Sequence, residues 1–153
     1  MIGDLVGLEV WEIYVYRGIL CLSIGECIDE EAELHRFDLE IQSPFRFVQK
    51  GRILLGSYER LHMEEENDIG LITLPIKITG VRVENLGDLF VELEREIVLE
   101  VFIDTAEKSE NWRLSDNLKG LEDDIVFNQK EKFFAQKAQE YKTIEEFLIR
   151  NAY

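Results

Sequence analysis

Residues 37–57, FDLEIQSPFRFVQKGRILLGS, are the densest run of strand signals in the chain. From Phe37 to Ile41 apolar and polar residues alternate, which is the period of a strand with one face on a core and the other in water. Ser43-Pro44 interrupts this pattern, because proline cannot donate to a β-ladder and restricts the residue before it. A second strand follows at once, with a turn predicted at Gln49-Lys50-Gly51. This stretch therefore predicts antiparallel β-structure.

Strand patterns of the same kind lie on both sides of the central stretch. The apolar alternation slips near Trp11-Glu12, which predicts a bulge or a turn there. Hairpin corners are predicted at Arg17-Gly18 and at Glu94-Arg95-Glu96. The predicted strands are Val6 to Tyr16, Leu20 to Ile24, the two of the central stretch, Leu74 to Val83, Leu89 to Leu93, Ile97 to Ile103 and Ser109 to Ser115.

The C-terminal segment changes to a helical period. Apolar residues recur there at spacings of three and four, and Thr143 with Glu146 matches a capping box. We expect one helix over about Lys130 to Tyr141 and a second from Thr143 onward, packed on the sheet. The fold predicted for residues 1–153 is a single, mainly β domain: an antiparallel β-sandwich or flattened barrel of about eight strands (1–118), with a helical C-terminal segment (119–153).

A gapped internal repeat is visible between the two halves of the β-rich part. Gly7 is matched with Gly80, ILCLSIGE (19–26) with LFVELERE (89–96), FDLEI (37–41) with VLEVF (98–102), and FRF (45–47) with WRL (112–114). The pattern suggests two four-strand units, although an antiparallel meander without duplication gives similar patterns.

The charge is strongly negative and unevenly distributed. The chain carries a net charge of −15, and residues 1–105 hold 22 acidic against nine basic residues. Such a field repels nucleic acid and anionic lipid and attracts a basic protein surface. Two predicted loops, Gly25 to Leu34 and Tyr58 to Gly70, concentrate the acids. The candidate protein-binding residues are Glu30, Glu31, Glu64, Glu65, Glu66 and Asp68.

Motifs for catalysis or cofactor binding are not recognised in the sequence. There is no glycine-rich phosphate loop and no nucleophile elbow, and the two histidines, His35 and His62, have no partner cluster with metal-ligand spacing. We therefore expect no catalytic residue, no cofactor and no metal. Cys21 and Cys27 fit neither a redox nor a metal motif, and are predicted to be small buried or half-buried thiols in a reducing compartment.

Two arginines hold equivalent places in the repeat. Arg46 and Arg113 each follow an aromatic residue on a strand, and a carboxylate such as Glu40 or Glu100 across the sheet would make them structural. The alternative is a small-ligand or enzymatic pocket within the β-structure, lined by Arg46, Trp112 and Arg113.

The motif QSPFRF (42–47), followed by Gly51 and LLGS, resembles a family of small uncharacterised bacterial proteins with a Q-x-P-aromatic-R strand motif. LEVF (99–102) and WRL (112–114) resemble the second part of that family's pattern, over roughly residues 5–115. The sequence departs from the pattern at 94–96, where Asn-Gly is expected. The resemblance implies no catalytic residues, and the small, acidic character is similar in style to immunity proteins.

Three functional hypotheses follow. The first is a non-catalytic cytoplasmic binding module, in the manner of an immunity protein that neutralises a basic toxin through acidic loops. The second is the small-ligand pocket, and the third is self-association into a homodimer through the helical tail. Without a leader or an apolar run of the roughly 20 residues needed to span a bilayer, the sequence predicts neither secretion nor membrane insertion.

Overall fold

The computed structural model describes residues 2–60, 67–68, 70–84, 86–105, 110–119 and 125–128. Within these ranges the chain is mostly β, with one short 3-10 helix, η1, and one helical turn, α1. The predicted mainly antiparallel β class is confirmed. The elements are η1 (Ile2–Leu5), β1 (Glu9–Tyr16), β2 (Ile19–Asp29), β3 (Leu34–Ile41), β4 (Phe45–Gln49), β5 (Arg52–Gly56), α1 (Ser57–Arg60), β6 (Asn67–Asp68), β7 (Ile76–Val83), β8 (Leu89–Leu93), β9 (Ile97–Val101), β10 (Glu110–Asp116) and β11 (Ile125–Asn128).

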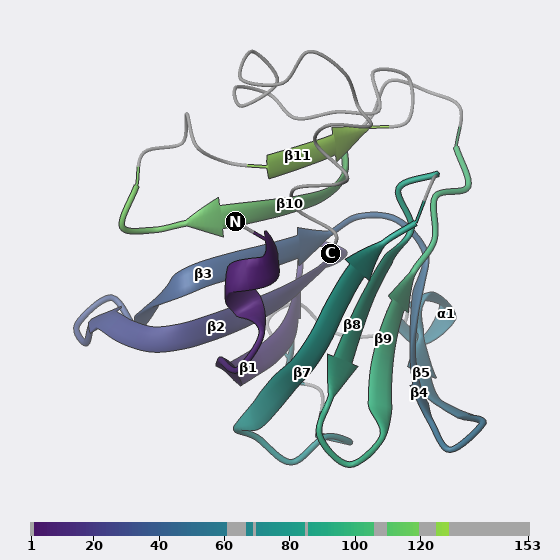
Figure 1. The fold of residues 1–153 in the computed structure, drawn as a ribbon, viewed down its shortest axis with the longest axis horizontal. Helices are drawn as coiled ribbons and strands as arrows, with labels where there is room; N and C mark the ends of the chain where they lie inside the picture. Colours follow the sequence, from purple (N-terminus) through teal and green to yellow (C-terminus); the bar gives the residue numbers. More distant parts are fainter. Residues whose placement is uncertain are drawn as a thin grey trace.

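The strands form one open path in the order β11-β10-β3-β2-β1-β7-β8-β9-β4-β5, with β6 paired to β1. Figure 1 shows two groups of strands at an angle, β1, β2, β3, β10 and β11 on one side and β7, β8, β9, β4 and β5 on the other. The groups join where β1 pairs with β7 through Glu9 with Lys77 and Val10 with Ile76. The described residues thus form eleven strands in one bent open sheet, where about eight were predicted, and the predicted sandwich or flattened barrel is not confirmed.

A single apolar core takes residues from both groups of strands. Phe37, Leu39 and Ile41 of β3 are buried as their alternation predicts, and Leu99 of β9 and Trp112 of β10 join the same cluster. Each fully buried side chain of this kind stabilises the fold by roughly 1.5–3 kcal/mol relative to its exposed state. The core therefore ties the N-terminal and C-terminal halves into one unit.

The strand order is palindromic. If β1 to β5 are exchanged with β7 to β11, the order reads the same from the opposite end. In each half the first three strands are neighbours in the sheet, and the fourth strand pairs with the third strand of the other half. Thus β4 pairs with β9, and β10 pairs with β3. The two halves thus exchange their fourth strands, which is the arrangement expected for two related units.

The register corrects three of the four matches made in the repeat. Leu20 and Leu89 hold equivalent places, because they pair with Ile41 and Val101 respectively, so FDLEI matches IVLEV (97–101). The matches predicted for the runs 19–26 and 37–41 are therefore each shifted by one residue from the register in the sheet. Gly80, which pairs with Glu92 next to a bulge, corresponds to Glu12 rather than to Gly7.

The match of FRF with WRL is the one that the register bears out. Arg46 lies opposite Glu100, and Arg113 lies opposite Glu40, at equivalent places in the two groups. An arginine facing a glutamate on the neighbouring strand therefore occurs once in each half.

Three predicted hairpin corners are present, two as two-residue turns and the one at 94–96 as a three-residue connection, and each has two consecutive residues with left-handed backbone. The φ angles are 48° and 78° at Arg17-Gly18, 49° and 75° at Lys50-Gly51, and 60° and 58° at Arg95-Glu96. Such turns match the twist of the strands that they join, and glycine adopts this backbone at least cost. The last turn has no glycine, so two L-residues hold a left-handed conformation there.

Two boundaries differ from the sequence-based expectation. Residues 25–29 continue β2 instead of beginning a loop, because register shifts after Ile24 and Cys27 absorb the additional residues. Strand β11 lies inside the segment 119–153 that the sequence assigned to helix, and it pairs with β10. The two predicted helices lie outside the described residues.

Candidate functional site

The two halves differ most at the hairpin between their second and third strands. In the C-terminal half β8 and β9 are joined by the tight turn at residues 94–96, whereas β2 and β3 extend into a long hairpin. We call residues 26–34 the acidic arm. Figure 1 shows it projecting at the left, away from β7, β8 and β9. Its exposed carboxylates are Glu26, Asp29, Glu30, Glu31 and Glu33.

The tip of the acidic arm is organised by its own polar groups. The Asp29 carboxylate accepts hydrogen bonds from the backbone amides of Glu31 and Ala32 at 3.1 and 3.2 Å. The amide of Glu33 donates to the carbonyl of Glu30 at 3.3 Å, and Glu33 has a left-handed backbone with φ 52°. The exposed carboxylates of Glu30 and Glu31 therefore sit on a defined turn.

An aromatic stack lies at the base of the acidic arm. The rings of Trp11 and His35 are 6.1 Å apart between centroids and 21° from parallel. Nδ1 of His35 donates to the carbonyl of Gly25 at 2.8 Å, which fixes the imidazole. Gly25 has φ +86°, a left-handed backbone that favours glycine, and a Cβ there would be in ordinary contact with the Cβ of Arg36 at 3.4 Å.

Trp11 is exposed because it lies at a bulge. The β1–β2 register shifts between Val10 and Glu12, which leaves the indole 43% exposed instead of in the core. The bulge predicted from the slipped alternation is confirmed. The equivalent bulge in β7 carries Thr79, so the exposed indole belongs to one half alone.

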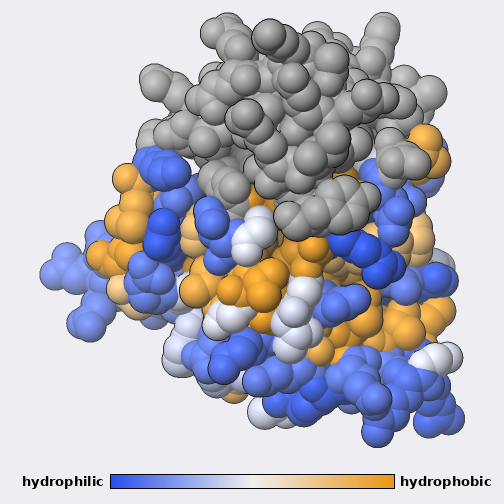
Figure 2. Space-filling view, viewed as in Figure 1, coloured by the Kyte–Doolittle hydropathy of each residue, from blue (hydrophilic) through white to orange (hydrophobic). Residues whose placement is uncertain are grey.

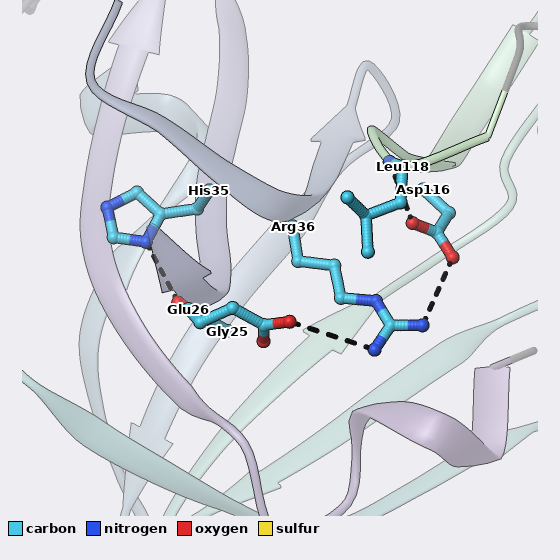
Figure 3. Close-up of polar contacts among 6 residues, drawn as sticks. All are labelled: Gly25, Glu26, His35, Arg36, Asp116 and Leu118. Carbon is cyan, nitrogen blue, oxygen red and sulfur yellow. Dashed lines mark hydrogen bonds and ion pairs between the residues drawn. The ribbon is translucent and has the colours of Figure 1, made fainter. Parts of the chain in front are cut away.

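Arg36 connects the acidic arm to β10 (Figure 3). Its guanidinium is 3.8 Å from the carboxylate of Glu26 and 3.5 Å from that of Asp116, and it also lies over the Phe37 ring. The Asp116 side chain is 1% exposed and accepts the amide of Leu118 at 3.1 Å. A buried carboxylate paired in this way is costly to break, so Arg36 fixes the arm against the sheet.

Asn117, directly after β10, is hydrogen-bonded to the part of β3 that follows the acidic arm. Its side-chain amide donates to the carbonyl of His35 and to the carboxylate of Asp38, both at 2.8 Å. Its backbone amide donates to the carbonyl of Arg36 at 2.7 Å. Both the side chain and the backbone of Asn117 therefore donate hydrogen bonds to β3.

A groove of about 410 Å³ opens beside Trp11, where β1 meets β7. On the face drawn in Figure 2, apolar residues reach the surface between hydrophilic ones in the middle of the described part. The groove combines an aromatic ring, an aliphatic side chain, two carboxylates and one ammonium. Its lining residues are Gly7, Leu8, Glu9, Trp11, Gly25, Glu26 and Lys77.

The structure brings together only part of the predicted acidic surface. Glu30 and Glu31 lie on the arm tip, whereas Asp68 lies in β6, whose backbone pairs with Tyr14 of β1. Glu64, Glu65 and Glu66 lie outside the described residues, as does the side chain of Asp68.

The alternative pocket is not assembled from its three predicted residues. Trp112 is fully buried in the core, and its Nε1 donates to the carbonyl of Gly87 at 2.9 Å. Arg46 on β4 pairs with Glu100 and lies over the Phe102 ring. Arg113 pairs with Glu110, and its alternation with Trp112 along β10 puts it on the opposite face. Arg46 therefore pairs with a carboxylate across the sheet, as the structural interpretation predicted, whereas Arg113 pairs with Glu110 on its own strand.

The two thiols differ in their surroundings. Cys21 is buried and Cys27, on the acidic arm, is exposed, and both are free. Burial, together with the carboxylates of Glu40 and Asp38, raises the pKa of Cys21 to about 12. Burial and the neighbouring acids also raise the pKa of Tyr14 to about 12. Cys21 is therefore a protonated, unreactive thiol at neutral pH.

Comparison with protein-family models, with curated proteins and with solved structures found no match. Among the described residues no helix is long and apolar enough to cross a bilayer. No group of three or more histidine, cysteine, aspartate or glutamate side chains in the same ranges is placed to hold a metal ion.

Proposed function

We propose that the chain is a non-catalytic, cytoplasmic protein-binding module that holds a basic partner against its acidic arm. The observation that carries this proposal is the arm itself: five exposed carboxylates within residues 26–34, present in one half of a palindromic fold and replaced by a tight turn in the other. A feature that the scaffold does not require is a good candidate for the functional part.

The charge of the acidic arm suits a rapid encounter with a basic surface. Clustered exposed carboxylates on a chain of net charge −15 steer a positively charged protein toward them, and salt screens this attraction. Because Arg36 and Asn117 hold the base of the arm, less conformational entropy is lost on binding than with a free loop. Glu64, Glu65, Glu66 and Asp68 are proposed as further binding residues from their charge in the sequence.

Within this class we favour an immunity protein that neutralises a basic toxin, such as a nuclease. Neutralisation of this kind needs a complementary surface and no reaction chemistry. An acidic surface matches a nuclease, since an enzyme that binds phosphates presents cations around its active site. The free thiols Cys21 and Cys27 fit a reducing compartment.

The test is a pulldown from bacterial lysate at low and high salt, with matched charge variants. The arm variant is Glu30→Gln/Glu31→Gln. The control, Glu96→Gln/Asp104→Asn, removes the same charge from exposed sites elsewhere. We expect a basic protein to be retained by the wild type and the control at low salt and lost at high salt. The arm variant should associate with that protein about tenfold more slowly.

Equal retention of the same protein by the arm variant and the control would contradict the use of the arm. The immunity interpretation is tested separately, by expressing the retained protein with and without this chain. Growth that is arrested by the partner alone and restored by co-expression supports it, and a partner that is harmless when expressed alone excludes it.

A further inference from the structure

We infer that the groove beside Trp11 is a binding site for an arginine side chain of the partner. This inference rests on the proposed function and assigns its anchoring contact. The arm carboxylates supply long-range attraction, but exposed charges add little affinity once the partners touch. Binding energy concentrates instead where an aromatic residue becomes covered by the partner. The groove is open and presents the exposed Trp11, and it adjoins the base of the acidic arm through Gly25 and Glu26.

The chemistry of the lining matches a planar cation. Trp11, which stacks with His35, is 43% exposed, so a guanidinium can lie over its indole ring. Glu9 comes from β1 and Glu26 from the start of the arm, and either carboxylate can accept paired N–H donors from a guanidinium. Leu8 supplies apolar surface for the aliphatic part of the arginine side chain.

The fold itself contains a contact of the same kind. Arg36 lies over the Phe37 ring, 4.9 Å from its centroid, while it pairs with Glu26 and Asp116. Arg46 likewise lies over the Phe102 ring, 5.0 Å from its centroid, while it pairs with Glu100. An arginine from a partner that stacked on Trp11 and paired with Glu9 or Glu26 would repeat this arrangement between two chains.

Lys77 makes the sign of the ligand's charge testable. It is the one cation in the groove lining and lies opposite Glu9 in the β1–β7 pair. For a cationic ligand Lys77 is repulsive, so Lys77→Gln should tighten binding by about two- to fivefold. For an anionic ligand the same substitution removes an attractive group and weakens binding.

The experiment titrates full-length protein with the blocked tripeptide acetyl-Gly-Arg-Gly-amide and follows the indole N–H signals by NMR. Acetyl-Gly-citrulline-Gly-amide is the matched control, because citrulline has nearly the shape of arginine without its charge. We expect a saturable shift of the Trp11 signal with the arginine peptide and none with the citrulline peptide. Trp11→Ala should weaken binding about tenfold, and Glu26→Gln by about two- to fivefold.

Equal shifts with both peptides, or weaker arginine binding after Lys77→Gln, would overturn the inference. So would the absence of any shift with the arginine peptide at concentrations up to tens of millimolar. Since Trp11 is exposed at a bulge, its replacement should leave the circular dichroism spectrum unchanged. The Lys77→Gln test keeps the proposal falsifiable if Trp11→Ala does not fold.

The failure of this inference is distinguishable from the failure of the proposed function. If the pulldown depends on the arm charges while the peptide does not bind, the acidic module stands and the groove is not its anchor. If the peptide binds while retention of the partner does not depend on the arm charges, the groove binds arginine but the acidic arm is not part of the partner's binding site. With the purified partner, Trp11→Ala should raise the dissociation rate, whereas the arm variant should lower the association rate.

Discussion

Replacing Trp112 by phenylalanine tests whether this residue belongs to the core or to a binding site. The indole is fully buried, and its Nε1 donates to the carbonyl of Gly87 in the loop between β7 and β8, which belong to the other group of strands. Phenylalanine keeps an aromatic ring in the core but removes the donor and part of the volume. The substitution therefore tests whether Trp112 stabilises the fold, as its position indicates, or binds a ligand.

The expected cost is the sum of two effects. A buried carbonyl left without a donor costs about 1–3 kcal/mol. The smaller ring leaves an unfilled volume on the order of 40 Å³, which costs about 1 kcal/mol at about 24 cal/mol per Å³. Trp112→Phe should therefore lower the free energy of unfolding by about 2–4 kcal/mol. A domain with a stability of about 5–15 kcal/mol tolerates that loss and still folds.

Urea unfolding followed by far-UV circular dichroism measures this difference. We expect a lower midpoint with an unchanged slope. The matched control is Trp11→Phe at the only other tryptophan, which is exposed and should change the stability by less than about 0.5 kcal/mol. A loss below about 1 kcal/mol for Trp112→Phe, or equal losses for both variants, would refute the reasoning.

Three further predictions follow from the thiols, from Tyr14 and from the strained turn. With a disulfide reagent at pH 8, Cys27 should react quickly and Cys21 only after unfolding; two equally fast thiols in the native protein would contradict the assigned burial. Burial raises the pKa of both Cys21 and Tyr14 to about 12, from ordinary values of 9.0 and 10.0. The unfolded chain then releases these protons at lower pH than the folded chain does. The free energy of unfolding should therefore fall as the pH rises from 9 to 12, and Cys21→Ala should reduce that slope; an unaltered slope would exclude a contribution from Cys21. Glu96→Gly relieves a left-handed backbone in an exposed turn beside Arg95, so it should raise the free energy of unfolding by about 0.5–1 kcal/mol. A lower urea midpoint for Glu96→Gly would show that the turn is not strained.

The strands could be predicted from the sequence wherever they cover the core. Alternation identified β3 and β8, since inward residues such as Leu39 and Val91 must be apolar. The same signal failed beyond Gly25, because the acidic arm has no core beneath it and a solvated hairpin has no hydrophobic period. The exchange of β4 and β10 was also not predictable, since pairing depends on which edge of the other half is free.

The candidate site was only partly predictable, because its key residue has the composition of a core residue. Trp11 lies in a run of strand-forming apolar residues, and only the slip at Trp11-Glu12 marked the bulge that turns it outward. The acidic residues of the arm were found from charge alone. Their connection through Arg36 to Asp116 joins residues 80 positions apart, and no local pattern contains it.

The exchange of the fourth strands has a consequence for how the chain matures. During synthesis, β3 and β4 emerge before β9 and β10, so the N-terminal half leaves the ribosome with two strand edges that have no partner. The paired residues are 48 to 56 positions apart in the sequence for β4 with β9 and 71 to 79 positions apart for β3 with β10, which slows folding. Assembly must therefore wait until almost the whole sheet has been translated. Until then, the open edges of the nascent chain are surfaces that a chaperone or a second nascent copy can occupy.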